Sequence, residues 1–314
     1  MNRREFILGS AAACAAAGCR TVGGSDAANG PVGLTGVTPP YEPNLRDRCW
    51  TWGHDSGVFD GPDNKYKIPT SAPLTMPEAN RMLGIPNICA ITWKKPDEKY
   101  LADFRDVKRV SWLMASKHEV YERQVEDNFE RLAKMPNLTG FDLDDFFRTD
   151  KTRKEYSPRD GREYEVREGG LSLNELENLK RRMLRTGRTL ETRLVLYVRQ
   201  LVPEIAPALD RVDTVLLWTW DGADVTKLAE NWKTYRTFCP AKPTLLGIYM
   251  WDFGGRKPLE MDFMRHQLAF AKDLFRRGEI EGLIFHCTPL ANKNLEAVEC
   301  CRKWIDENAD LTRA

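Results

Sequence analysis

Short apolar runs alternate along the chain with longer segments in which apolar residues recur every three or four positions. The runs have the length of buried strands, and the segments between them have the period of amphipathic helices. We predict strands over residues 48–57, 87–93, 107–115, 139–147, 194–198, 214–221, 244–252 and 282–287. Strands that alternate with helices favour a parallel sheet with crossover helices.

The helical pattern is strongest over residues 258–277, and two other helices begin with clear start signals. Thr75 is followed three residues later by Glu78, and Ser172 by Glu175, which is the capping-box spacing. Further helices are expected at residues 119–135, 203–209, 223–238 and 295–308. Eight strand–helix units predict a single (β/α)8 barrel of the TIM type, with a doubly wound open sheet as the alternative.

The segment after the fourth predicted strand, about residues 148–170, is long, polar and of mixed charge. A segment of this length inside a compact domain is usually a functional lid or a small inserted hairpin. A solvated loop without regular structure is the alternative.

The first 44 residues differ in character from the rest of the chain. Residues 2–8 (NRREFIL) resemble a twin-arginine export signal, and residues 16–19 (AAGC) resemble a bacterial lipobox in which Cys19 is lipidated. Simple signal cleavage is the alternative. Residues 20–44 are rich in Gly, Ala, Pro and Thr and are expected to form a flexible tether before a domain at residues 45–314. We therefore expect a bacterial protein that is periplasmic or held at the membrane by its lipid alone.

Composition narrows the class of function. The chain has 314 residues and a formal net charge of +1, which argues against a broad nucleic-acid or anionic-membrane surface. The strand-to-helix turns contain neither G-x-G-x-x-G nor a Walker lysine loop, so no nucleotide cofactor is indicated. The eight cysteines follow neither a zinc-site nor a disulfide-framework spacing.

The most unusual stretch is the strand at residues 139–147, TGFDLDDFF. Side chains alternate along a strand, so Asp142 and Asp144 share a face, roughly 6 to 7 Å apart. Their repulsion should raise at least one pKa, which suits acid/base chemistry. Asp142, Asp144 and Asp145 are therefore the candidate catalytic residues. The alternative is that these carboxylates bond backbone amides or arginines.

In a barrel the active site lies at the carboxyl ends of the strands. Those ends carry mainly aromatic and acidic side chains, together with two histidines. Aromatic rings stack on the apolar faces of sugars, and carboxylates bond their hydroxyls, so a carbohydrate site is indicated, with core packing as the alternative for each ring. The candidate substrate-binding residues are His54, Asp55, Trp93, Tyr197, Trp218, Trp220, Asp221, Tyr249, Trp251, Asp252 and His286.

The sequence GFDLDDF resembles the fourth-strand motif D-G-x-D-x-D-x-E of chitinase-like barrel glycosidases. Gly140, Asp142 and Asp144 match the motif, whereas Thr139 replaces its first Asp and Phe146 stands where the catalytic Glu belongs. Residues 218–221 (WTWD) are also similar to an aromatic-Asp strand of that family. The broader resemblance is to barrel-type glycoside hydrolases, and it implies that Asp144 or Asp145 supplies the acid in place of the missing Glu.

Three functions remain open at this point. The first is a glycoside hydrolase in which Asp144 is the general acid/base, Asp142 stabilises charge, and Asp221 or Asp252 is the second carboxylate. The second is a metal-dependent sugar isomerase or epimerase that would use His54, Asp142 and His286. No H-x-H or H-E-x-x-H spacing supports such a site, so we expect neither metal nor cofactor. The third is a glycan-binding lipoprotein without catalysis, which Phe146 favours.

Overall fold

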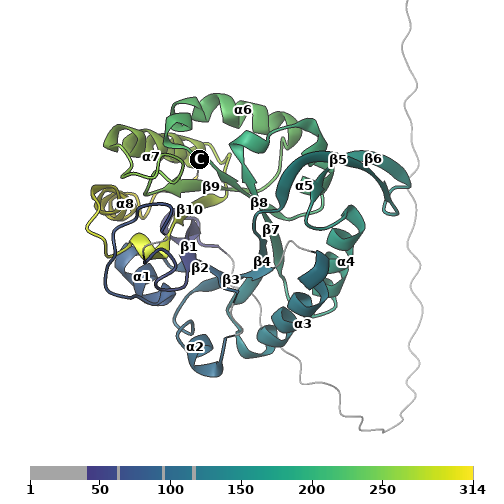
Figure 1. Ribbon diagram of the computed structural model, residues 1–314, viewed down its shortest axis with the longest axis horizontal. Coiled ribbons are helices and arrows are strands. Elements are labelled where there is room, and N and C mark those ends of the chain that lie inside the picture. The colour runs from purple at the N-terminus through teal and green to yellow at the C-terminus, as the bar shows by residue number, and fades with distance from the viewer. Residues whose placement is uncertain (1–40, 62–63, 94–95, 115–117, 314) are drawn as a thin grey trace, which may run out of the picture. The chain divides into compact units, whose positions relative to one another are not determined.

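Eight parallel strands close into a barrel, in the order β1-β10-β9-β8-β7-β4-β3-β2. The computed structural model describes residues 41–313 except 62–63, 94–95 and 115–117. The barrel strands are β1 (Cys49–His54), β2 (Asn87–Ile91), β3 (Arg109–Met114), β4 (Leu138–Leu143), β7 (Glu191–Tyr197), β8 (Thr214–Trp218), β9 (Thr244–Tyr249) and β10 (Gly282–His286). The closed parallel order confirms the predicted (β/α)8 barrel and excludes the open sheet (Figure 1).

Helices surround the ring of strands in Figure 1. They are α1 (Met76–Leu83), α2 (Glu98–Ala102), α3 (His118–Lys134), α4 (Leu173–Leu184), α5 (Ala206–Leu209), α6 (Leu228–Phe238), α7 (Met261–Arg276) and α8 (Glu296–Glu307). Short 3-10 turns are η1 (Arg46–Arg48), η2 (Val198–Gln200), η3 (Pro203–Ile205), η4 (Gly222–Lys227) and η5 (Thr288–Leu290). Both predicted capping boxes, at Thr75 and Ser172, are confirmed. No described helix is long and apolar enough to cross a membrane.

The polar segment after β4 forms an antiparallel hairpin of β5 (Phe147–Ser157) and β6 (Arg162–Gly169), which projects beside the barrel (Figure 1). Its base is fixed by Phe146, whose ring packs so closely on Gly169 that any Cβ there would overlap it. Its far end is held by Arg211, which donates to the hydroxyl of the buried Ser157 over 2.8 Å. The hairpin is therefore anchored at both ends.

The amino-terminal end of the barrel is closed by charged and aromatic side chains. Arg109, at the start of β3, pairs with the buried Asp47 over 3.0 Å. The guanidinium of Arg109 lies 4.3 Å from the ring centre of Tyr41. Asn44 forms a bridge with Thr312. Tyr41 and Asn44, at the end of the predicted tether, thus contact residues of the barrel domain.

Candidate functional site

The acidic stretch ends at the carboxyl end of β4, where a barrel enzyme carries its catalytic groups. Asp144 and Asp145 follow Leu143, the last residue of the strand. Asp145 has a positive φ of 47°, a left-handed conformation that turns the chain sharply. Its backbone N–H donates to Asp144 Oδ1 over 2.8 Å, and Tyr197 Oη donates to Asp145 Oδ1 over 3.3 Å. The two carboxyl groups therefore lie together at the mouth of the barrel.

The carboxyl group of Asp144 is held close to its titration point at neutral pH. Burial among protein atoms, the negative charge of Asp145 and a smaller contribution from Asp142 together raise the pKa of Asp144 to about 7. The N–H of Asp145 and the more distant Arg148 oppose this shift. We expected repulsion between Asp142 and Asp144 to raise a pKa; in the structure burial is the larger cause. A half-protonated carboxyl near pH 7 suits a general acid/base.

Asp142 lies deeper than Asp144, inside the barrel, and is fully buried. Burial raises the pKa of Asp142 to about 6, and the positive charge of Arg193 opposes the shift. Neither of its carboxylate oxygens has a hydrogen bond of good geometry among the described residues. At that depth it cannot be reached by a glycan, so its effect is on the charge of Asp144 above it.

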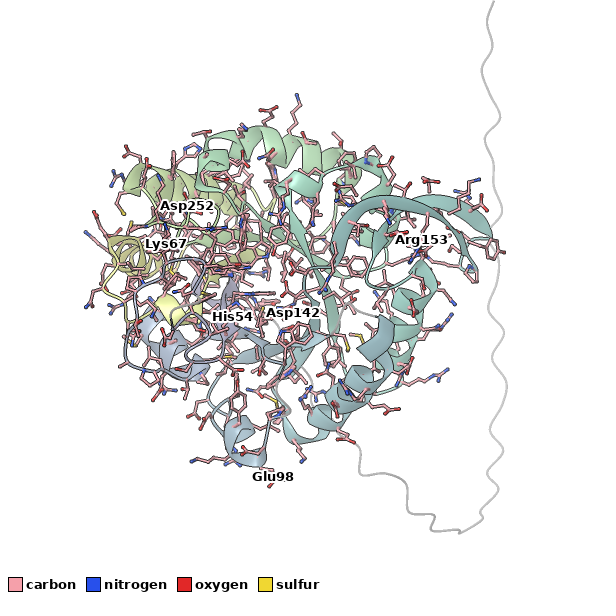
Figure 2. All side chains as sticks on the ribbon, viewed as in Figure 1. His54, Lys67, Glu98, Asp142, Arg153 and Asp252 are labelled. Atoms are coloured by element: carbon pink, nitrogen blue, oxygen red, sulfur yellow. The ribbon has the colours of Figure 1, made fainter. Side chains whose placement is uncertain are left out.

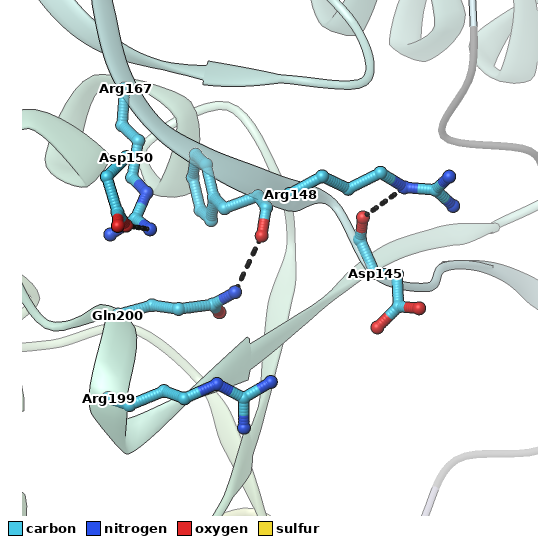
Figure 3. Close-up of a pocket in the computed structure, with 7 residues that line it drawn as sticks. Asp145, Arg148, Asp150, Arg167, Arg199 and Gln200 are labelled. Carbon is cyan, nitrogen blue, oxygen red and sulfur yellow. Dashed lines mark hydrogen bonds and ion pairs between the residues drawn. The ribbon is translucent and has the colours of Figure 1, made fainter.

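A cleft of about 510 Å³ opens beside Asp145 at the base of the hairpin (Figure 3). It is lined by Asp145, Phe147, Arg148, Asp150, Arg167, Arg199 and Gln200. Arg167 is held by Asp150 and by the carbonyl of Thr149. Arg199 lies just beyond the carboxyl end of β7. Arg148 and Gln200 have no local signature in the sequence, because their place in the cleft depends on how the hairpin docks.

Aromatic rings fill the mouth of the barrel over β1, β8, β9 and β10. The ring of His286 lies 4.5 Å from that of Phe253, 4.9 Å from Tyr249 and 5.5 Å from Trp218, measured between centroids. His54, labelled near Asp142 within the ring of strands in Figure 2, lies 5.7 Å from His286. Burial lowers the pKa of His54 to about 4 and that of His286 well below its usual range, so both imidazoles are neutral at pH 7.

The tryptophans and the tyrosine of the predicted aromatic wall differ in their exposure and in their distance from the cleft. Trp218 and Tyr249 are buried under the cluster, and Trp251 is 2% exposed with its N–H donating to the carbonyl of Tyr66 over 3.1 Å. Trp93 lies beyond the end of β2 and is 59% exposed. Trp220, half-buried, is the ring that joins the cluster to the cleft, since it lies 5.9 Å from Tyr197 and from the Arg199 guanidinium.

Three of the predicted substrate-binding carboxylates bond groups of the protein instead. Asp55 accepts from Thr92 and Tyr100, each over 2.6 Å. Asp252 is buried and accepts from the amides of residues 222 and 255. Asp221 caps η4 by accepting from the amide of residue 223. Asp145, whose backbone N–H bonds Asp144, is the carboxylate that lies directly beside Asp144.

The motif position that carries Glu in chitinase-like enzymes is filled by a buried ring. Phe146 is 1% exposed and packs edge-on against Phe147, with ring centroids 4.9 Å apart. It supports the hairpin and does not face the cleft.

Cys19, the predicted lipidation site, lies outside the described residues.

Among the described residues, no group of three or more His, Cys, Asp and Glu side chains is arranged to hold a metal ion. The ligand set His54, Asp142 and His286 that we considered for a sugar isomerase is therefore not assembled. The six described cysteines are all free thiols.

No protein-family model matches the sequence, and the search of curated proteins finds no match. Solved structures resemble the barrel at low identity. Active domain 2 of a chitinase from Pyrococcus furiosus, complexed with chito-oligosaccharides, is 12% identical, with 85% of this chain and 96% of that chain covered and a TM-score of 0.49. A β-1,3-glucanosyltransferase from Rhizomucor miehei, in complex with laminaritriose, is 11% identical, with 76% and 86% covered and a TM-score of 0.48.

A probable 2-pyrone-4,6-dicarboxylic acid hydrolase from Acinetobacter baumannii is similar to the same extent, at 10% identity with 83% of this chain and 91% of that chain covered and a TM-score of 0.47. One barrel architecture hosts many unrelated reactions. At these levels of similarity the neighbours share the barrel fold with this chain and indicate neither its substrate nor its reaction.

Proposed function

We propose that the protein is a carbohydrate-acting barrel, a glycoside hydrolase in which Asp144 is the general acid/base. One observation supports this above the others: a carboxyl group with a pKa of about 7 lies at a strand's carboxyl end, beside a second carboxylate. Glycosidases need one protonated and one ionised carboxyl group across the scissile bond. Asp144 would protonate the leaving oxygen, and Asp145 would stabilise positive charge on the sugar or activate water.

Neighbouring side chains fit these roles. The Tyr197 hydroxyl that bonds Asp145 holds its carboxylate in one orientation. Trp220 offers a half-buried aromatic face next to the cleft, against which a sugar ring would stack. Asp142 beneath the site favours the protonated form of Asp144, because a second negative charge nearby makes ionisation more costly.

A second candidate, a glycan-binding protein without catalysis, is favoured by one observation. Phe146 stands at the position of the motif's catalytic Glu, and its buried ring packs against Gly169 at the base of the hairpin. In this case the barrel would bind a sugar at Trp220 and the cleft without cutting it.

One screen separates the two candidates. The mature domain, its Asp144→Asn variant and an Asp103→Asn control are tested on a panel of oligosaccharides for both binding and hydrolysis. Asp103 is an exposed carboxylate at the end of α2, so its loss removes a charge without touching the site. We expect Asp144→Asn to lower turnover by about 10² to 10⁴-fold, the usual contribution of acid/base catalysis, with the control unchanged. Binding without turnover by the unmodified domain would instead support the second candidate.

Export and lipid attachment at Cys19 are proposed from the sequence alone. The lipid attached at Cys19, together with the tether, would hold the barrel at a membrane surface. Cys19→Ala should move the protein from the membrane fraction to the soluble periplasmic fraction. A wild-type protein that is already soluble and carries no lipid would refute the proposal.

A further inference from the structure

Two arginines reach the cleft with donor groups that no described residue uses. The guanidinium of Arg199 lies over the ring of Tyr197, 4.2 Å from the ring centre, and has no hydrogen-bond or ion-pair partner within the described part of the chain. Arg148 donates its Nε to the carbonyl of Asp145 over 3.0 Å. Its two terminal amino groups remain free of described partners. In Figure 3 the carboxylate of Asp145 lies between these two side chains.

The charges of the cleft do not balance. Arg167 and Asp150 pair with each other, so they cancel. What remains are the positive charges of Arg148 and Arg199 and the negative charge of Asp145. A cleft with surplus positive charge and unused guanidinium donors attracts anionic oxygen groups.

Gln200 also ties together the two backbone segments that carry these arginines. Its side-chain amide donates to the carbonyl of Phe147 over 2.7 Å, and its side-chain oxygen accepts from the backbone N–H of Tyr197 over 2.9 Å. Gln200 thereby joins the start of β5, which carries Arg148, to η2, which carries Arg199. A site whose geometry is fixed before binding loses less entropy when the ligand arrives.

We propose that Arg148 and Arg199 bind an anionic substituent of the glycan, either the carboxylate of a uronic acid or a sulfate ester. This inference rests on the proposed function, since it places the anionic sugar next to the linkage that Asp144 would protonate. Guanidinium groups bind carboxylate and sulfate oxygens through paired, charge-assisted hydrogen bonds. The preferred substrate is accordingly an acidic polysaccharide and not a neutral one.

The test compares three oligosaccharides of equal length: a uronan, a sulfated galactan and a neutral galactan. Their affinities for the full domain are measured by calorimetry at low and moderate salt. We expect one anionic ligand to bind at least about tenfold more tightly than the neutral one, a preference that weakens as salt is added. Comparing the affinity for the uronan with that for the sulfated galactan shows whether the site prefers a carboxylate or a sulfate ester. Equal affinities for all three would overturn the proposal.

Variants assign the preference to the two arginines. Arg148→Gln and Arg199→Gln should each lower the affinity for the anionic ligand by about tenfold or more, the usual loss for one charged hydrogen bond, and leave the neutral ligand unaffected. Arg105→Gln is the matched control, because Arg105 is exposed on the turn before β3, at the opposite end of the barrel. Anion binding that survives in both cleft variants would refute the assignment, provided that thermal melts show them folded.

This inference and the proposed function fail in different ways. If the domain binds acidic glycans through both arginines and cleaves none of them, the inference stands and the glycosidase proposal is refuted. If it hydrolyses neutral glycans and neither binds nor cleaves acidic glycans better than neutral ones, the inference is refuted and the glycosidase proposal stands.

Discussion

Replacing Asp144 by Asn is expected to stabilise the folded protein at neutral and alkaline pH. The folded state raises the pKa of Asp144 from 3.8 to about 7, so it binds a proton more tightly than the unfolded state does. Below pH 3.8 the group is protonated in both states and has no effect on stability. As the pH rises from 3.8 to 7, the wild type loses stability, because ionisation is easier in the unfolded chain. Above pH 7 the loss is complete and constant.

The pKa difference sets the size of this effect. A shift from 3.8 to about 7 corresponds to an upper limit of roughly 4 kcal/mol. Asp144 keeps some contact with water, and relaxation around it will reduce the cost, so we expect about 2 kcal/mol. For a domain of this size that raises the melting temperature by about 4 to 8 °C. The Asn side chain retains an oxygen to accept the N–H of Asp145, so the turn is preserved.

The assay is urea unfolding of wild type, Asp144→Asn and the Asp103→Asn control at pH 4, 6 and 8. The advantage of Asp144→Asn should be small at pH 4 and reach its full size at pH 8, whereas Asp103→Asn should follow wild type throughout. An Asp144→Asn variant that is less stable than wild type at pH 8 would show that the carboxylate is a structural group, and the reasoning from its burial would be wrong.

Three further outcomes follow from burial in the same region. Burial depresses the pKa of His54 to about 4 and that of His286 well below its usual range, so stability present above pH 6.5 is lost as the pH falls towards 4. His286→Phe should reduce this loss in urea unfolding at pH 7 and 5, and an unchanged pH dependence would contradict the reasoning. Phe146→Glu should cost roughly 3 kcal/mol or more, since it buries a charge where a ring packs, and should not raise hydrolysis; a folded, more active variant would disprove this. Trp251→Ala should cost about 3 to 5 kcal/mol of stability without changing glycan affinity per folded molecule. Trp220→Ala should instead weaken glycan binding by about 1 kcal/mol in calorimetry. Lost stability in Trp220→Ala together with lost glycan affinity in Trp251→Ala would show that Trp251, and not Trp220, contacts the sugar.

The barrel and the place of the acidic residues follow from the sequence because both depend on local pattern. Apolar runs of strand length, interrupted by capped amphipathic helices, leave few arrangements other than a closed parallel sheet. Asp144 and Asp145 follow a buried strand directly, so the rule that barrel sites lie at strand carboxyl ends placed them at the barrel mouth.

The directions of the tryptophans in the aromatic wall could not be predicted from the sequence. The prediction extended two strands to residues 221 and 252, and side chains alternate between two faces only within a strand. β8 stops at Trp218 and β9 at Tyr249. Beyond those points the chain no longer follows an extended period of two residues, so Trp220 and Trp251 take unrelated directions. One reaches the edge of the cleft, and the other is buried against the segment that contains Tyr66.

The cleft could not be predicted because it is built by long-range docking. Arg148 and Arg199 are 51 residues apart and come together only because the hairpin folds back over Phe146 and Gln200 ties β5 to η2. Neither contact has a local signature in the sequence. The buried Asp142 is a similar case, since the opposing charge of Arg193 comes from the neighbouring strand β7.

The most direct test of the central claim, that Asp144 donates the proton to the leaving oxygen, varies the leaving group. Wild type and Asp144→Asn are compared on aryl glycosides of the sugar that the hydrolysis screen identifies, one with a good leaving group (dinitrophenol) and one with a poor one (phenol). A good leaving group departs without protonation, so it does not need the acid. We predict that Asp144→Asn loses about 10² to 10⁴-fold in kcat/KM on the phenyl glycoside and far less on the dinitrophenyl glycoside. An equal loss on both substrates, or no loss on either, would contradict the assignment of Asp144 as the acid.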